Sequence, residues 1–141
     1  MDLPEISDGD AATARTLEDR LLQDLRDGQA QGRNRTTTLV MHDTDGTLIA
    51  GLTGAQSYGW LLIKVLWVAP DRRGRGLGRA LVARAAQDAR LAGAHAMWLD
   101  TSNPKAREFY EALGFSVFTS LENAPDDTPP NHRRWFLKCP L

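Results

Sequence analysis

A turn that holds three glycines and four arginines has the composition of an anion-binding site. It runs from Arg72 to Arg79 and joins an apolar run, Val65 to Val68, to a segment with helical spacing. Free backbone N–H groups and the positive dipole end at a helix start both favour a phosphate, and glycine lets the ligand approach the backbone closely. Arginine adds charge-assisted hydrogen bonds to phosphate oxygens. The turn therefore predicts a site for a phosphate-bearing ligand.

The spacing of the glycines excludes two common phosphate loops. A Walker A loop needs a lysine directly after its last glycine, and no glycine in this chain is followed by lysine. The dinucleotide fingerprint Gly-x-Gly-x-x-Gly fails because Arg79 or Leu81 falls in its last place. The pattern that fits is Arg73-x-x-Gly76-x-Gly78. It resembles the Gln/Arg-x-x-Gly-x-Gly/Ala signature of the GCN5-related N-acetyltransferase (GNAT) family, whose loop cradles the pyrophosphate of acetyl-coenzyme A.

A second motif lies further along the chain. Asn103 is placed to open a helix, Ala106 follows three residues later, and Phe109-Tyr110 precedes a Leu-Gly-Phe run. This closely resembles the second conserved block of the same family, in the expected order and at the expected separation from the first. The resemblance covers roughly residues 17–141 and points to a bacterial small-protein subgroup.

The resemblance implies which residues contact the cofactor. In the family, the strand before the loop pairs its backbone with the pantetheine arm, and the loop N–H groups hold the pyrophosphate. Asn103 would hydrogen-bond the pantetheine, although it could equally serve only as a helix N-cap, and the two roles are compatible. The residues expected to contact acetyl-coenzyme A are Leu66, Trp67, Val68, Arg73, Gly74, Arg75, Gly76, Leu77, Gly78, Arg79, Asn103 and Phe109.

The resemblance also implies a catalytic role for Tyr110, which would protonate the leaving thiolate as general acid. Amine attack on a thioester gives a tetrahedral oxyanion that backbone N–H groups can stabilise, and a positioned hydroxyl assists departure of the thiol. The alternative for Tyr110 is a place in the core, since its spacing from Ala106 is helical.

A general base is harder to name. Many family members carry a carboxylate on the strand before the loop, but here that strand has no acid, and Lys64 stands where relatives of the subgroup often have one. Asp100 on the adjoining strand is a candidate base, or a polar residue at a strand end. Tyr58 and Trp60 complete the set of candidate contacts to the acceptor substrate, with ordinary sheet packing as their alternative.

Length and composition bound the protein further. A chain of 141 residues, 42% of them apolar and 25% charged, fits one globular domain over residues 1–141. The net charge of −1 argues against general affinity for nucleic acid or acidic membranes. Cys139 is the only cysteine, and the three histidines lack metal-ligand spacing, so we expect no metal. Without a signal-peptide pattern or a membrane-length apolar run, we expect a cytoplasmic protein, and the family's habit suggests a homodimer.

Periodicity and turn residues give the order of the elements. The fold class is α/β (α+β): a mixed, mostly antiparallel central sheet with one parallel β-α-β crossover, flanked by helices. The third strand is nearly all apolar, which predicts a central strand covered on both faces. Residues 54–57 are expected to connect two strands. We predict helices over residues 10–28, 77–93 and 103–113, and strands over 36–43, 47–53, 58–68, 96–101, 115–121 and 134–139.

These observations predict an acetyl-coenzyme A-dependent N-acetyltransferase that acts on a primary amine of a small molecule by direct transfer in a ternary complex. Cys139 is remote from both motifs, which disfavours a covalent acyl-enzyme. Two alternatives stay open. One is a non-catalytic acyl-coenzyme A sensor, suggested by the missing strand carboxylate. The other is a protein N-acetyltransferase.

Overall fold

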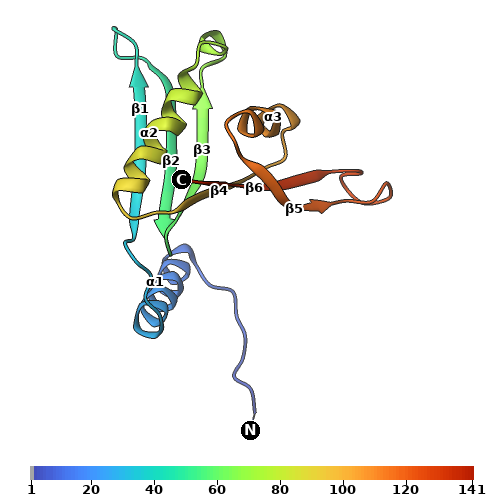
Figure 1. Cartoon of the computed structure of the whole chain (residues 1–141). Coiled ribbons are helices and arrows are strands. Elements are labelled where there is room, and N and C mark those ends of the chain that lie inside the picture. Colours follow the sequence, from blue (N-terminus) through green and yellow to red (C-terminus); the bar gives the residue numbers. More distant parts are fainter. Residues whose placement is uncertain (1) are drawn as a thin grey trace. The chain divides into compact units, whose positions relative to one another are not determined.

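The computed structural model describes residues 2–141, which form two compact units, one up to Gln31 and one from Gly32 to Leu141. Each unit is described by itself. The elements, labelled in Figure 1, are α1 (Ala11–Gly28), β1 (Arg35–His42), β2 (Leu48–Ser57), β3 (Trp60–Val68), a short 3₁₀ turn η1 (Pro70–Arg72), α2 (Leu77–Leu91), β4 (Ala96–Thr101), α3 (Pro104–Ala112), β5 (Ser116–Glu122) and β6 (Arg133–Pro140).

The first unit is built on α1, which starts where the sequence predicts. The carboxylate of Asp10 caps the helix by accepting a hydrogen bond from the Thr13 backbone N–H, 2.7 Å away. Hydrogen bonds from Thr13 also hold the pKa of the Asp10 carboxyl below its usual value. Leu17 and Leu21 are exposed on α1. Among residues 2–141 no helix has both the length and the apolarity that crossing a bilayer requires.

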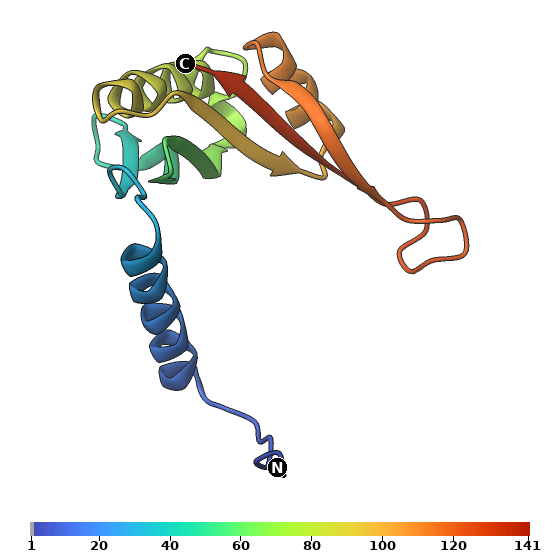
Figure 2. The same cartoon turned by 60° about the horizontal axis from the view of Figure 1, so that its bottom comes forward.

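The second unit contains a six-stranded mixed sheet in the order β1-β2-β3-β4-β6-β5. Only β3 and β4 are parallel neighbours; the other four pairs are antiparallel. Two crossovers, β3–α2–β4 and β4–α3–β5, run in the same direction across the sheet. Right-handed connections therefore put α2 and α3 on the same face, as Figure 2 shows. The predicted fold class is confirmed.

The core lies between this face of the sheet and the two helices. Each fully buried leucine stabilises the fold by about 1.5–3 kcal/mol relative to an exposed one. The small side chains of α2 let the helix pack closely on the sheet, and α3 adds Tyr110. The core includes Leu52, Leu61, Leu99 and Leu137 from the strands and Leu81, Val82, Ala85 and Ala89 from α2.

The second strand is longer than predicted. Residues 54–57, expected as a connection, continue β2 to Ser57, and the turn is Tyr58-Gly59, with φ of 54° and 79°. These two positive φ values give the tight turn that suits a hairpin. Gly54 indicated a loop in the sequence, but it lies within β2. Glycine is needed there because a Cβ would lie 2.7 Å from the Leu62 carbonyl oxygen of the neighbouring strand.

The prediction that β3 is covered on both faces is wrong for its second half. Val65 and Trp67 are 52% and 42% exposed, whereas Leu61 and Ile63 are buried. The change follows a β-bulge, because Thr53 pairs with Val65 but Gly54 pairs with Ile63, which leaves Lys64 as the extra residue. The bulge re-aims the second half of β3, where the anion turn begins.

Candidate functional site

Strands β3 and β4 pair over a short distance and then separate. Their parallel ladder has three positions, Trp60 to Leu62 against Ala96 to Trp98. Beyond them β4 pairs with β6 on its other side, and β3 continues to Val68 beside β2. Figure 1 shows the two strands diverging toward the anion turn. The β4-facing edge of β3 therefore offers backbone groups with which an extended, amide-containing chain can pair.

A cavity of about 480 Å³ lies where the strands diverge. It brings the two sequence motifs together, although they are about 30 residues apart in the chain, because the β3–α2–β4 crossover returns the chain to the same end of the sheet. Every residue predicted to contact the cofactor lines it except Arg75, and so does Tyr110. Arg72, Lys105 and Ala106 also line it, although neither motif predicted that they contact the cofactor.

The start of α2 forms one wall of the cavity. Its N-cap residue is Gly76, with φ of 82° and no side-chain cap. The first intrahelical hydrogen bond runs from the Ala80 N–H to the Gly76 carbonyl, so the preceding N–H groups have no acceptor inside the helix. A Cβ on Gly76 would meet nothing within 4 Å, so its open side faces no protein atom. This is the geometry of an anion site at a helix N-terminus.

Helices α2 and α3 meet at the same cavity. A Cβ on Gly78 would lie 3.4 Å from Cζ of Phe109 and 3.7 Å from Cδ2 of Leu66. Glycine at this position therefore lets the aromatic ring of α3 lie against the backbone of α2. The two glycines of the motif differ in purpose: Gly76 supplies the positive φ, and Gly78 the close approach.

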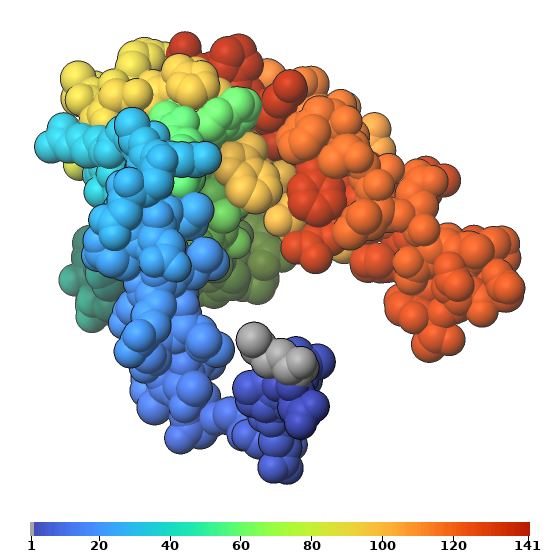
Figure 3. Space-filling model, turned by 90° about the horizontal axis from the view of Figure 1, so that it is seen from below, coloured from blue at the N-terminus to red at the C-terminus, as the bar shows by residue number. Residues whose placement is uncertain are grey.

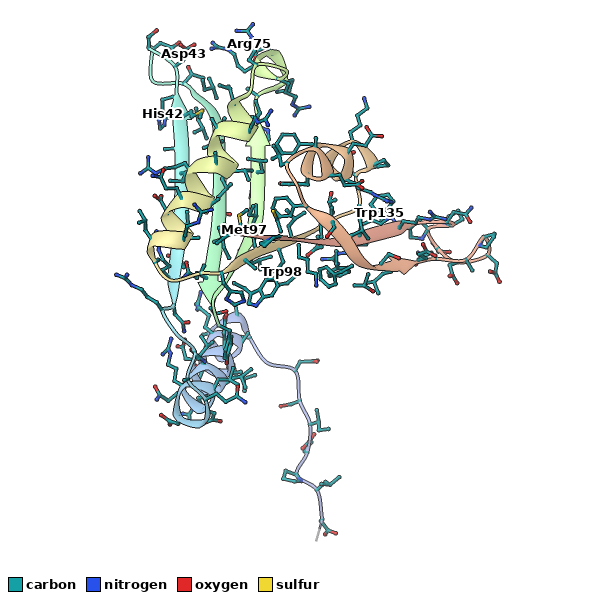
Figure 4. The ribbon with its side chains drawn as sticks, viewed as in Figure 1. His42, Asp43, Arg75, Met97, Trp98 and Trp135 are labelled. Carbon is teal, nitrogen blue, oxygen red and sulfur yellow. The ribbon has the colours of Figure 1, made fainter. Side chains whose placement is uncertain are left out.

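The loop arginines divide into two groups. Arg72 forms an ion pair with Asp43 in the β1–β2 turn, and Arg73 Nε donates to the Val68 carbonyl at 2.9 Å. The Thr44 backbone N–H and Arg72 together lower the pKa of Asp43. These two arginines make hydrogen bonds within the protein, and Arg73 also lines the cavity, where its contact with the cofactor stays a prediction. Arg79 lines the cavity, and Figure 4 shows Arg75 at the tip of the loop.

Asn103 combines two positions that the sequence left as alternatives. Its Oδ1 accepts from the Lys105 backbone N–H at 2.9 Å, which makes it the N-cap of α3. Its own N–H donates to Thr101 Oγ1 at 3.1 Å. Asn103 also lines the cavity, and capping uses only the oxygen of its amide. Contact between the amide nitrogen and a ligand stays a prediction.

Tyr110 lies both in the core and at the cavity. It is 7% exposed, and its ring packs edge-on against Phe109 and Phe115 with centroid distances of 5.1 and 5.3 Å. Burial raises the pKa of the Tyr110 hydroxyl to about 12. The hydroxyl therefore stays protonated at neutral pH and can donate a proton, but it is not suited to accept one.

The candidate acceptor contacts lie apart from this cavity. Trp60 packs edge-on against His95, with the ring centroids 5.3 Å apart. It precedes Val68 by eight residues, so the two lie roughly 26 Å apart along β3. Tyr58 is in the hairpin turn beside it. Lys64 is the exposed bulge residue, and Asp100 Oδ1 is 2.7 Å from Arg134 Nη2. None of these four lines the cavity.

Residues 2–141 include no group of three or more histidine, cysteine, aspartate or glutamate side chains placed to hold a metal ion. The side chains around the cavity carry basic and aromatic groups, while its lining includes no carboxylate and no imidazole. The cavity can therefore bind an anion and donate protons, but its lining offers no general base.

Known proteins resemble this chain in sequence. The family model described as Acetyltransferase (GNAT) family matches residues 5–115. The acetyltransferase Atu2258 of Agrobacterium fabrum is 30% identical over 119 residues, which cover 84% of this chain and 85% of that protein. The streptothricin acetyltransferase of Streptomyces lavendulae is 37% identical over 107 residues, 72% of this chain but 55% of the relative.

Solved structures resemble it in fold. A protein of Agrobacterium tumefaciens classed as an acetyltransferase has a TM-score of 0.84 at 26% identity, with 100% of both chains covered. A Bacillus anthracis protein crystallised with acetyl coenzyme A has a TM-score of 0.66 at 18% identity, covering 75% of this chain and 62% of the other, a likeness of fold alone. The match of the family model over most of the chain, together with the Agrobacterium relatives, shows that this chain belongs to the GNAT acetyltransferase family.

Proposed function

We propose that this protein transfers the acetyl group of acetyl-coenzyme A to a primary amine of a small molecule, by direct transfer in a ternary complex. The observation that carries the proposal is the joining of three features in one cavity: the uncapped start of α2, the divergent edge of β3, and the buried hydroxyl of Tyr110. Each matches a different part of one acyl donor.

The residues fit such a donor along its length. The N–H groups that follow Gly76, together with Arg79, suit the pyrophosphate. The edge of β3 suits the two amides of the pantetheine arm, with the Asn103 amide nitrogen as a further donor. Leu66 and Phe109 supply an apolar wall for the methylene groups between them.

The chemistry follows from this placement. The amine nitrogen forms a bond to the thioester carbon, and the carbon–sulfur bond then breaks. Tyr110 gives its hydroxyl proton to the departing thiolate, and solvent returns a proton to Tyr110. The proton lost by the amine leaves to solvent, since the cavity lining holds no carboxylate or imidazole. An amine with a low pKa, already neutral in solution, would suit such a site.

Support for a small acceptor comes from relatives. Streptothricin acetyltransferase and the blasticidin-S acetyltransferase of Streptomyces morookaense, 36% identical over 81 residues, are both named for small molecules. Direct transfer agrees with the position of Cys139, which lies on β6 and is absent from the cavity lining.

The proposal is tested by isothermal titration calorimetry with acetyl-coenzyme A, followed by a thiol-release assay with a panel of amines. Gly76→Asp places a carboxylate where the pyrophosphate should bind and should weaken binding by about 100-fold or more. Gly46→Asp is the matched control. Gly46 has φ of 88° in the β1–β2 turn, and its Cβ would also meet nothing within 4 Å.

Three outcomes would change the proposal. If the folded wild-type protein does not bind acetyl-coenzyme A, the site assignment fails. Binding without release of thiol for any amine would favour the non-catalytic sensor. Turnover of peptides in preference to small amines would favour a protein N-acetyltransferase.

A further inference from the structure

The chain contains three lysines, and they lie in different surroundings. Lys64 is the exposed bulge residue of β3, Lys138 lies on β6 with Nζ 5.4 Å from the Phe118 ring centroid, and Lys105 is the second residue of α3. Lys105 alone among them lines the cavity. The other fourteen of the 17 lysine and arginine residues are arginines.

The backbone of Lys105 is fixed, but its ammonium is not engaged. Its N–H donates to Asn103 Oδ1 at 2.9 Å, which holds the residue at the start of α3. Arg107 pairs with Glu111 one turn later on the same helix, and Arg84 pairs with Asp88 on α2. Over residues 2–141 the Lys105 side chain has no ion-pair partner. A cation with a long flexible stem therefore stands at the cavity without a counter-charge.

The opposite wall has fewer available cations than its sequence suggests. Arg72 is paired with Asp43, and Arg73 donates to the Val68 carbonyl. Among the described residues, Arg73 and Arg79 are left as the loop arginines that line the cavity without an ion-pair partner, together with the open N–H groups at the start of α2. A ligand with more than one phosphate carries several negative charges, so a further cation on the α3 wall would complement it.

We propose that Lys105 binds a phosphate group of the acyl donor from the α3 wall, across the cavity from the arginine-glycine loop. The inference rests on the proposed function, since it takes the ligand to be acyl-coenzyme A. Its consequence is donor specificity. Lys105 makes the site favour an acyl group carried on a phosphate-bearing nucleotide over the same group on a pantetheine chain without phosphate.

The first test compares Lys105→Ala with Lys138→Ala by titration with three acetyl donors. Lys105→Ala should weaken acetyl-coenzyme A binding by about tenfold, the usual size for one hydrogen bond to a charged group, and should leave S-acetylpantetheine binding unchanged. Acetyl-dephospho-coenzyme A distinguishes the two phosphate sources. If its binding is also weakened, the contact is with the pyrophosphate; if it is not, the contact is with the 3′-phosphate.

A second test uses the unaltered protein. An amine-reactive label mapped by mass spectrometry should react less with Lys105 when coenzyme A is present, with Lys64 and Lys138 as internal references. The proposal is overturned if Lys105 is not protected, or if Lys105→Ala weakens all three donors equally or none. Failure of the wild-type protein to bind acetyl-coenzyme A would instead count against the proposed function itself.

Discussion

Two strand-to-helix connections lie at the same end of the sheet, and the helices that they enter are capped differently. Strand β4 enters α3 through Asn103, whose side chain caps the helix, and Pro104, which needs no N–H acceptor. Strand β3 enters α2 through Gly76, which has a positive φ and offers no side-chain cap. Both helix starts contribute to one cavity. Asn103 accepts a hydrogen bond from one backbone N–H of α3, whereas no side chain caps the start of α2, so its N–H groups are open to a ligand.

The two walls would have different tasks. The α2 wall would supply binding through its backbone, and the α3 wall would supply side chains, Tyr110 for proton transfer and Lys105 for charge. Substitution of Tyr110 should therefore affect catalysis, whereas substitution of Gly76 or Lys105 should affect binding.

The largest effect is expected from Tyr110→Phe. Loss of a positioned general acid should lower kcat by about 10²–10⁴-fold, while the affinity for acetyl-coenzyme A changes by less than about threefold. Steady-state kinetics and calorimetry measure the two quantities. Tyr58→Phe is the control for the affinity, since Tyr58 is the other tyrosine of the chain and lies outside the cavity. An unchanged kcat for Tyr110→Phe would assign Tyr110 to the core only.

The same residue should make stability depend on alkaline pH. Burial raises the pKa of Tyr110 in the folded protein to about 12, above the ordinary value of 10.0, so folding favours the protonated form. This contribution is complete below pH 10 and is lost as the pH rises to 12, and it reaches at most about 2–3 kcal/mol. Urea unfolding between pH 9 and 11.5 would measure it. Tyr110→Phe should flatten the dependence relative to Tyr58→Phe, and equal slopes would contradict the burial argument.

A smaller effect is expected at the cap of α3. Asn103→Ala should lower the free energy of unfolding by about 1 kcal/mol, because the Lys105 N–H loses its acceptor. Asn103→Asp keeps the cap and should keep the stability. If the amide nitrogen of Asn103 also contacts the ligand, both variants should weaken acetyl-coenzyme A binding. Weakening by Asn103→Ala alone would mean that only the cap matters.

The smallest effect is expected from the ion pair that ties the α2 wall to the β1–β2 turn. Asp43→Asn should weaken acetyl-coenzyme A binding by about two- to fourfold, since exposed ion pairs contribute little and here act only by positioning the loop. Arg72→Gln should do the same, and the double variant should be no weaker than either single one. Additive losses would mean that Arg72 contacts the ligand itself.

Local patterns in the sequence predict the fold well. Strand β4 falls on the predicted residues, and the cap of α3 at Asn103 follows from a local Asn-Pro pair. Gly76 and Gly78 indicate the α2 wall in the sequence, because a positive φ and a close approach of another chain segment each depend on having glycine at one position.

Long-range contacts explain what the sequence could not give. Arg72 forms an ion pair with Asp43, which is 29 residues away in the chain. The sequence of the loop therefore does not show that Arg72 is paired while Arg79 faces the cavity. Lys105 was missed because its place at the cavity depends on how α3 lies against α2. Gly54 suggested a turn because a glycine needed for close approach in a strand looks the same in sequence as one needed for positive φ.

The six-stranded sheet ends on one side at β5, where residues 123–132 protrude between β5 and β6 (Figures 2 and 3). The short pairing of β3 with β4 lies in its middle. With three residue pairs joining β3 to β4, the sheet consists of two half-sheets, β1-β2-β3 and β4-β6-β5. An acyl donor lying in the divergence would act as an extra strand and extend the region where the half-sheets are joined. We therefore expect the backbone amides of β3 and β4 beyond these three pairs to exchange hydrogen at different rates in the free protein and at similar, slower rates in the complex. The substrate would then complete the sheet that binds it.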